Sequence, residues 1–344
     1  MRSCLNLKSY FLWPEIAALD SKGMRNEWDE IETAMKIVEL KFQSIYPSFE
    51  VVLFPSCRAA LYSILQYLNL RRNDYVAIPP YSSHCVIEVV GRLAMPTTDY
   101  SSKSTVSLIY NQWGITQKLR NCVENLVIED SCDSLVINEE GLFPNGGLFE
   151  VFSLPKILGT TFGGIAVCKT KEYADCLRKI RATRSIELSK VQYFLKNKAL
   201  SNSLNSLYYQ YWQGGEALNG FLPMVALCQI EKYFQQWIGL IKQREQRIIK
   251  VLDARLPLLI NPNLLLEHRL PVSLPIEVSH KQIEMNGFGS SMRHFNTSSD
   301  VNEENYIPCF PLPIHQQVSD KDFKQMIGSL KGDIIAQRER RGQI

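Results

Sequence analysis

The sequence predicts an α/β protein with a mostly parallel central sheet. Between about residues 50 and 185, short apolar segments alternate with amphipathic ones, as buried strands alternate with helices in such folds. Polar residues directly follow several of the apolar segments. Because ligands bind at the carboxyl ends of parallel strands, we expect these polar residues to gather in one functional site.

The individual elements follow from the spacing of apolar residues. Residues 26–45 carry apolar side chains at helical spacing, which predicts a helix before the first strand. The segments expected as strands are FEVVLFPS, DYVAIPPYSS, TVSLIYNQWG, LVIEDSCDSL, LFEVFSLPKIL and FGGIAVCK. Those expected as helices are CRAALYSILQYLNL, CVIEVVGRLA, QKLRNCVEN and TKEYADCLRKIRATRS.

The later part of the chain changes in character. One long helix is predicted over residues 224–252, followed by proline-bounded segments and a final helix that Ser319 caps. We therefore expect a large domain over residues 1–240 and a small α+β domain over residues 241–344. Residues 186–220 are rich in Asn, Ser, Tyr and Gln without a clear period, so their structure is not predicted.

Composition excludes several classes of protein. The net charge of +3 comes from interspersed acids and bases, which does not indicate a nucleic-acid partner. No apolar run approaches the roughly 20 residues that span a bilayer, so no membrane partner is expected. The nine cysteines include no CxxC pair, which favours reduced thiols in a cytoplasmic protein. The five histidines form no ligand motif, so we expect no bound metal.

The stretch VFSLPKILGTTFGGIAV, residues 151–167, sets Lys156 among apolar residues. A desolvated lysine amine can attack a carbonyl and form a Schiff base. A cofactor with an aldehyde and a cationic ring would also need a buried carboxylate, and Asp130 follows an apolar strand. Each signal alone also fits an ordinary surface lysine or a turn aspartate.

A phosphate on such a cofactor would need hydroxyls and backbone amides at a helix N-terminus. Ser56, Cys57 and Arg58 stand where a helix is predicted to begin, and Ser153 lies three residues before Lys156. The order along the chain is more specific than any single feature: an anion site at a helix start, a strand-end aspartate, Ser-x-x-Lys, and then Gly-Gly before a strand.

These residues resemble the DegT/DnrJ/StrS family of sugar aminotransferases, which have the aspartate-aminotransferase fold. The resemblance covers roughly residues 45–255 and is carried by VIED and FSLPKILGTTFGGIAV. It implies the cofactor pyridoxal 5'-phosphate, with Lys156 in the Schiff base and Asp130 at the pyridine nitrogen. It also implies that Ser153, Cys57 and Arg58 hold the phosphate.

The chain departs from the family pattern at three places. Asp133 stands where Gln or His contacts the ring hydroxyl, and an acid there must be protonated or paired with a cation. Ser83 stands where an aromatic residue stacks on the ring; the adjacent His84 is an alternative stacking residue or an ordinary loop histidine. The stretch FLPM at residues 221–224 replaces a segment that reaches the partner subunit, so that contact is not expected.

We therefore expect an aminotransferase that moves the amino group of glutamate to a keto-sugar, carried on a nucleotide, in surface-polysaccharide or secondary-metabolite biosynthesis. The resemblance also implies a homodimer. Two alternatives stay open: an enzyme with the same cofactor that dehydrates or rearranges a sugar, and a non-catalytic binding or regulatory relative. Lys156 disfavours the first, because dehydrating relatives replace this lysine with histidine. A buried lysine and a buried acid disfavour the second, because they are costly to keep without a function.

Overall fold

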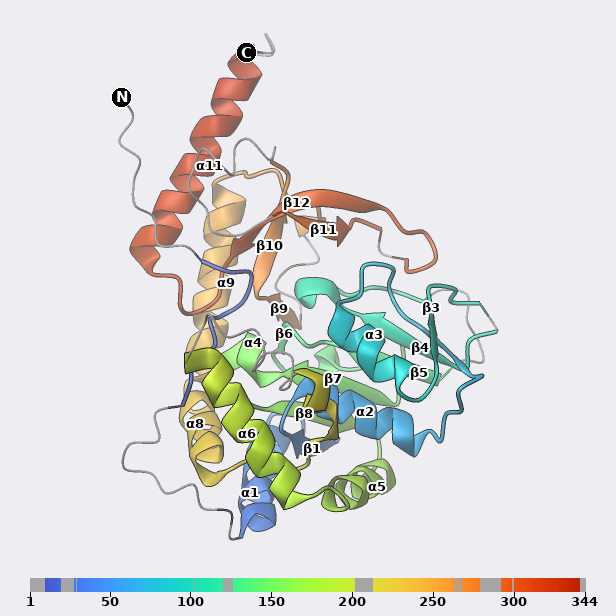
Figure 1. The fold of residues 1–344 in the computed structure, drawn as a ribbon. Coiled ribbons are helices and arrows are strands. Elements are labelled where there is room, and N and C mark those ends of the chain that lie inside the picture. The colour runs from blue at the N-terminus through green and yellow to red at the C-terminus, as the bar shows by residue number, and fades with distance from the viewer. Residues whose placement is uncertain are drawn as a thin grey trace.

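The structure is a computed structural model that describes residues 10–19, 28, 30–101, 103–119, 126–201, 213–262, 265, 268–278, 292–298 and 300–340. Within these residues a seven-stranded sheet has the order β1-β8-β7-β5-β4-β2-β3 (Figure 1). Every strand runs parallel except β8, which is antiparallel to both neighbours, so the mostly parallel sheet is confirmed. The strands are β1 (Glu50–Phe54), β2 (Tyr75–Ala77), β3 (Met95–Thr97), β4 (Val106–Tyr110), β5 (Leu126–Asp130), β7 (Phe149–Ser153) and β8 (Gly164–Cys168).

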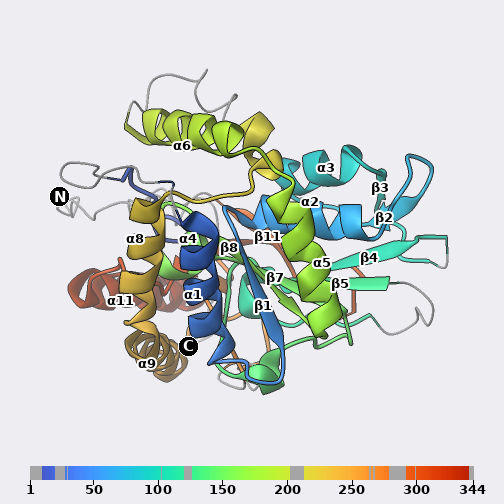
Figure 2. The ribbon, with the colours of Figure 1, turned by 90° about the horizontal axis from the view of Figure 1, so that it is seen from below.

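Helices cover both faces of this sheet. Side chains alternate along β1, so that Val51 and Leu53 enter one apolar core while Val52 and Phe54 enter the other. Helices α1 and α8 lie on one side of the strands, and α2 and α5 lie on the other (Figure 2). The helices are α1 (Ile31–Gln43), α2 (Cys57–Tyr67), α3 (His84–Gly91), α4 (Leu154–Leu158), α5 (Lys171–Ala182), α6 (Ile186–Ser201), α8 (Met224–Phe234), α9 (Trp237–Asp253) and α11 (Asp320–Arg340), with 3-10 turns at Gln112–Gly114, Glu139–Gly141 and Glu216–Leu218.

The C-terminal part of the chain contains a second, smaller sheet. Its sheet has the order β10-β12-β11 and lies with α9 and α11 beyond the carboxyl edge of the central sheet (Figure 1). The predicted boundary after residue 240 falls inside α9, and the division into two domains stays a prediction. A two-stranded ladder of β6 (Ser134–Val136) and β9 (Arg269–Pro271) joins this part to the segment that follows β5. The strands of the smaller sheet are β10 (Ser273–Ile276), β11 (Arg293–Asn296) and β12 (Tyr306–Pro313).

The single helix predicted over residues 224–252 is wrong. Helix α8 ends at Phe234 and α9 begins at Trp237. The rings of Phe234 and Trp237 both pack on Phe42 of α1, with centroid distances of 4.8 and 6.0 Å. Both contacts are edge-to-face, with interplanar angles of 69° and 86°, so the end of α8 and the start of α9 meet over Phe42.

The strand predicted over LFEVFSLPKIL ends earlier than expected. β7 stops at Ser153, and Leu154–Leu158 form the short helix α4. Pro155 lies in the first turn of α4, where its missing N–H leaves no hydrogen bond unmade. Gly159 ends the helix in the left-handed region with φ 79°. This turn carries Lys156 back along the carboxyl edge of the sheet.

Three other expectations have separate outcomes. Ser319 caps α11 as predicted, because its hydroxyl accepts a hydrogen bond from the amide of Asp322 at 3.1 Å. Of the helix predicted over residues 117–125, only residues 117–119 are described, and these are not helical. Within residues 186–220, which the sequence leaves open, the structure places α6. Each described helix is too short or too polar to cross a membrane.

Gly164 lets β8 approach the start of α2. A Cβ on this residue would lie 2.3 Å from the backbone nitrogen of Cys57. We expect Gly164→Ala to lower the free energy of unfolding by about 3 kcal/mol or more, because neither backbone can yield without moving a core element. Urea denaturation measures the change. The control is Gly239→Ala in α9, which meets no atom within 4 Å and should stabilise slightly. Equal stability of the two variants would contradict the steric argument.

Candidate active site

A cavity of about 680 Å³ opens at the carboxyl edge of the central sheet. Its volume lies within the range of small-molecule sites. The sequence-predicted residues on its wall are Ser56, Cys57, Arg58, Ser83, His84, Asp130, Ser153 and Lys156. Asp133 is fully buried beside the cavity and contacts it through Tyr110, which is part of the wall.

The topology explains why these residues meet. β1, β5 and β7 run parallel, so their carboxyl ends share one edge of the sheet. Ser56 follows the end of β1, Asp130 is the last residue of β5, and Ser153 is the last residue of β7. The short helix α4 then places Lys156 beside the residues that follow β5.

Lys156 is held among groups that favour its charged form. Its amine donates a hydrogen bond to the sulfur of Cys132 at 3.0 Å and lies 4.4 Å from the centre of the Trp13 ring. Burial lowers the pKa of Lys156, but Cys132, Asp133 and Asp130 outweigh this effect and raise it. The amine is therefore protonated while it faces these groups.

Asp130 is nearly buried at the end of β5. One carboxylate oxygen accepts a hydrogen bond from the backbone amide of Cys132 at 3.0 Å. Burial raises the pKa of Asp130, although Lys156 and the Cys132 amide act in the opposite direction. A carboxylate in this setting is stabilised by a cationic partner in the cavity.

Asp133 accepts two hydrogen bonds from neighbouring loops. One oxygen accepts from the hydroxyl of Tyr110 at 2.5 Å, and the other accepts from the backbone amide of Trp113 at 3.1 Å. Burial raises the pKa of Asp133 to about 6, against the lowering effect of Lys156 and these hydrogen bonds. A carboxyl with this pKa is protonated in part of the molecules near neutral pH. Protonation is one of the two conditions under which an acid fits the position where the family has Gln or His.

The start of α2 forms the corner where a phosphate is expected. The Ser56 hydroxyl accepts a hydrogen bond from the Ala59 amide at 3.1 Å and caps the helix. Cys57 is the first residue of α2, and its amide nitrogen faces Gly164 of β8. The guanidinium of Arg58 turns aside to an ion pair with Glu216 at 3.1 Å.

Ser83 and His84 lie on the more open wall of the cavity. The Ser83 hydroxyl is 2.8 Å from the sulfur of Cys85, and the His84 ring is 3.3 Å from the side-chain oxygen of Gln213. Tyr81, two residues earlier, stacks on His294 of β11 with a centroid distance of 4.6 Å and an interplanar angle of 5°. This stack joins the C-terminal part to the cavity wall.

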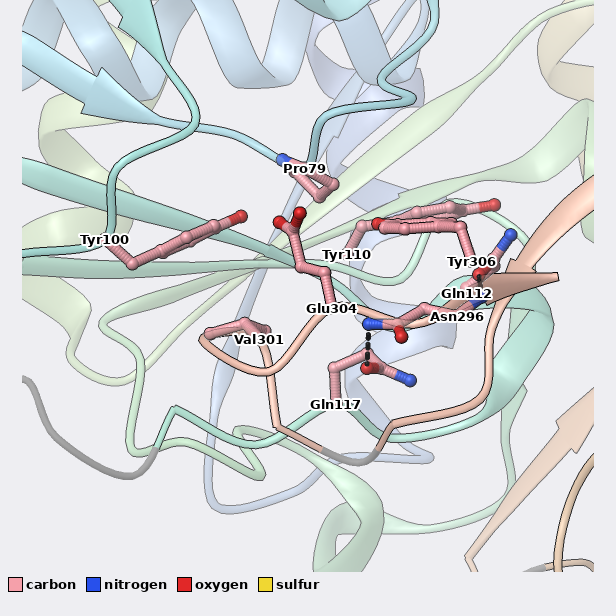
Figure 3. Close-up of a pocket in the computed structure, with 9 residues that line it drawn as sticks. All are labelled: Pro79, Tyr100, Tyr110, Gln112, Gln117, Asn296, Val301, Glu304 and Tyr306. Atoms are coloured by element: carbon pink, nitrogen blue, oxygen red, sulfur yellow. Dashed lines mark hydrogen bonds between the residues drawn. The ribbon is translucent and has the colours of Figure 1, made fainter.

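A second pocket, of about 10 Å³, adjoins the cavity behind Tyr110 (Figure 3). Such a volume holds about one water. On its wall Asn296 donates a hydrogen bond to the side-chain oxygen of Gln117 at 3.2 Å, and Glu304 and Tyr306 also line the pocket. The pocket is too small for a cofactor, and its contacts fix the C-terminal part against β4.

A buried polar network supports the site from behind. Glu150 of β7 accepts hydrogen bonds from Arg269 at 2.7 Å and from Ser131 at 2.5 Å. Arg269 belongs to β9, so this ion pair ties the C-terminal part to the residue that follows Asp130. Removing one partner of such a buried ion pair strongly destabilises a protein, because the other charge is then left without a partner.

Several wall residues lie outside the sequence-based predictions. Tyr110 ends an apolar strand, and that position was a usable signal. The other wall residues come from segments without a local motif. Trp13, for example, precedes the first helix, and Lys196 lies in a region whose structure the sequence does not predict. The additional wall residues include Trp13, Tyr81, Tyr110, Cys132, Lys196, Glu216, Arg293 and His294.

The fold of the central sheet, parallel with one reversed strand, is shared with solved aminotransferase structures. Three solved structures show this fold. TlmJ from Streptoalloteichus hindustanus is 15% identical, with 88% of this chain and 91% of TlmJ covered and a TM-score of 0.60. A DegT/DnrJ/EryC1/StrS aminotransferase from Brucella abortus is 14% identical, with 87% and 90% covered and a TM-score of 0.57. DesI, solved in the presence of its TDP-sugar product, is 12% identical, with 98% and 97% covered and a TM-score of 0.61.

A family model described as "Putative PLP-dependent aminotransferase" matches residues 38–333. The chain therefore belongs to this family of aminotransferases that use pyridoxal phosphate, which confirms the predicted activity class and cofactor. A search of the curated proteins finds no significant match. The solved structures confirm the predicted fold class.

The residues of the cavity fit pyridoxal phosphate. Lys156 offers an amine for the aldehyde, and Asp130 offers a carboxylate for the ring nitrogen. Gly164 keeps β8 close to the first amide of α2, in a position where a Cβ would collide with that backbone. The chemistry of this donor set matches an aldehyde, a pyridine nitrogen and a phosphate.

The pKa of Asp133 gives a pH-dependent contribution to stability. Because its folded value of about 6 lies above that of an exposed carboxyl, near 4, the contribution is present below pH 4 and is lost as the pH rises through 6. Relative to wild type, Asp133→Asn should gain on the order of 3 kcal/mol in unfolding free energy between pH 4 and pH 7. Urea denaturation at several pH values measures the difference. Exposed Asp253→Asn is the control, and a difference that stays constant with pH would contradict this pKa.

Proposed function

We propose that this aminotransferase transfers the amino group of glutamate to a keto-sugar carried on a nucleotide. The observation that carries the reaction is the convergence of Lys156 and Asp130 in one cavity. A nucleotide sugar is supported by the wall of that cavity, to which Trp13 and Tyr81 contribute aromatic side chains and Arg293 contributes a cation. The fold shared with DesI, which was solved in the presence of its TDP-sugar product, supports the same substrate class.

Lys156 and Asp130 carry the chemistry in this proposal. When bound, pyridoxal phosphate supplies an aldehyde that takes up the amino group and a ring that withdraws electrons from the reacting carbon. With the cofactor bound, Asp130 would hold a proton at the pyridine nitrogen. The free amine of Lys156 would move a proton between the α-carbon of the donor and the aldehyde carbon. Its contact with the Cys132 sulfur keeps this amine in reach.

The remaining predicted residues bind and orient. Asp133 and Tyr110 share one short hydrogen bond, and either can donate to the ring hydroxyl when the pair holds an extra proton. The residues proposed at the phosphate are Ser56, Cys57, Arg58 and Ser153, and those proposed at the ring face are Ser83 and His84.

We also propose that the protein works as a homodimer in the cytoplasm, within surface-polysaccharide or secondary-metabolite biosynthesis. Exposed apolar side chains on α6 support a dimer, since Val191 and Phe194 are each 52% exposed on the same helix. All the cysteines that the structure describes are free thiols, which supports a reducing compartment.

The decisive experiment compares the wild-type protein with Lys156→Ala after addition of pyridoxal phosphate. Wild type should show the absorption band of a lysine-linked cofactor, and borohydride should fix the cofactor to the peptide that contains Lys156. Lys156→Ala should lose the band, because the amine that would form the Schiff base is removed. With glutamate and a nucleotide-linked keto-sugar, only wild type should release 2-oxoglutarate, with a loss of at least about 10³-fold in the variant.

The control is Lys171→Ala, which removes an exposed lysine at the start of α5. An unchanged band in Lys156→Ala would contradict the role of this lysine. A dehydrated sugar without release of 2-oxoglutarate would favour the dehydratase alternative. A protein that binds nucleotide sugars without turnover would favour the regulatory alternative.

The dimer has its own test by light scattering. The expected mass is twice the 39.4 kDa of one chain. Phe194→Glu should shift the protein toward monomer, because it places a charge in the apolar surface of α6. Ile249→Glu, at an exposed apolar residue of α9, is the matched control and should leave the mass unchanged. A wild-type monomer would contradict the homodimer, and a dimeric Phe194→Glu would contradict the role of α6.

A further inference from the structure

Residues 10–19, here called the N-terminal strap, form part of the cavity wall beside Lys156. Leu12, Trp13 and Ile16 of the strap line the cavity. All residues of the strap are described, and they contain neither helix nor strand, so contacts with other elements hold the strap in place. These contacts therefore decide which strap side chains reach the cavity.

Hydrogen bonds from the C-terminal part hold the strap on both sides of Trp13. Before Trp13, the hydroxyl of the buried Ser273 donates to the Leu12 carbonyl at 2.6 Å. After it, the Gln317 side chain accepts from the Glu15 amide at 2.6 Å and donates to the Glu15 carbonyl at 2.9 Å. The backbone that flanks Trp13 is thus fixed, and the position of its ring follows from these bonds.

The ring of Trp13 meets the amine of Lys156. The nitrogen lies 4.4 Å from the ring centre, within the distance at which a cation is attracted to an aromatic face. The amine carries its charge there, because nearby thiol and carboxyl groups outweigh the effect of burial and raise the pKa of Lys156. Tryptophan is the aromatic side chain that binds a cation most strongly, so the contact favours the ammonium form.

Several titratable groups surround the same amine. Cys132 accepts its hydrogen bond at 3.0 Å, and burial raises the pKa of Cys57 in α2 while Lys156 acts in the opposite direction. The groups that face the amine are Cys57, Asp130, Cys132 and Asp133. Trp13 differs from them because its ring does not titrate. A substitution of Trp13 therefore changes the surroundings of the amine without adding or removing a charge.

The charge on Lys156 controls its reactivity toward a carbonyl. The ammonium must first lose one proton, after which the nitrogen bonds to the carbonyl carbon and one water molecule leaves. A contact that stabilises the ammonium slows this reaction, because it lowers the fraction of unprotonated amine. The ring of Trp13 and the carboxyl groups act in the same direction.

We propose that Trp13 is a positioning residue for Lys156, whose ring holds the charged amine against the N-terminal strap whenever no carbonyl is attached. This inference rests on the proposed role of Lys156 in the Schiff base. The ring keeps the released amine at the wall of the cavity, from which it returns to a carbonyl. Since the strap is bound to Ser273 and Gln317, the C-terminal part fixes where the amine rests.

The test measures the rate at which Lys156 forms a Schiff base with pyridoxal, which has no phosphate. The full chain, freed of cofactor, is mixed with pyridoxal at pH values from 6 to 10, and absorbance follows the reaction. Trp13→Leu should react about threefold faster or more at pH 7, with its pH profile displaced to lower pH by about half a unit or more, because the ammonium loses the aromatic face. Trp13→Phe keeps a ring and should lie between wild type and Trp13→Leu.

Phe11→Leu is the matched control. Phe11 belongs to the same strap, is 53% exposed and is not among the residues that line the cavity. Its rate should equal that of wild type. Alkylation of Cys132 by iodoacetamide measures access to the same place, since this sulfur lies 3.0 Å from the amine. The alkylation rate should change less in Trp13→Leu than the rate of Schiff base formation.

The other outcomes contradict the proposal in distinct ways. A rate in Trp13→Leu that equals or falls below that of wild type would overturn it while leaving the role of Lys156 intact. If Trp13→Leu does not fold, the same comparison of Trp13→Phe with wild type decides. Equal acceleration of alkylation and Schiff base formation, or equal acceleration in Phe11→Leu, would also overturn it, because a loosened wall would then explain the effect. A wild-type protein that forms no Schiff base at Lys156 would overturn both this inference and the proposed function.

Discussion

The cavity depends on one half-buried amine that is set beside a thiol and two carboxyl groups. Burial lowers the pKa of Lys156, and Cys132, Asp133 and Asp130 outweigh this effect. These groups meet only because β5 and β7 are paired in parallel, so that both strands end at the same edge. The register of β5 and β7 therefore determines which side chains meet at the cavity, in addition to how the two strands pair.

The anion corner depends on a close backbone contact. β8 runs against its neighbours, and its first residue, Gly164, abuts the start of α2. The helix then presents its first amides to the cavity, where the charges of Arg58, Lys196 and Glu216 also lie. The close contact with Gly164 and the neighbouring charged side chains therefore both act on the first residues of α2.

The C-terminal part is tied to the site by buried polar contacts. Arg269 of β9 reaches Glu150 and Ser131, the latter adjacent to Asp130. The same part places Arg293 and His294 on the cavity wall. A shift of this part would therefore disturb the strand end at Asp130 as well as the wall of the cavity.

The sequence by itself predicted the alternation of strands and helices over about residues 50–185, the strand-end position of Asp130, and Lys156 as an amine set among apolar residues. Those features are local, because each depends on apolar spacing or on residues within one turn. Only the tertiary structure decided the break between α8 and α9, whose ends pack on the distant Phe42, and the short helix that places Lys156 beside Cys132. The cation from Lys196 belongs to the same group, since its partner Glu216 lies across a segment without periodic signal. Contacts between remote segments carry no pattern in the sequence, and that is the physical reason the site could be predicted only in part.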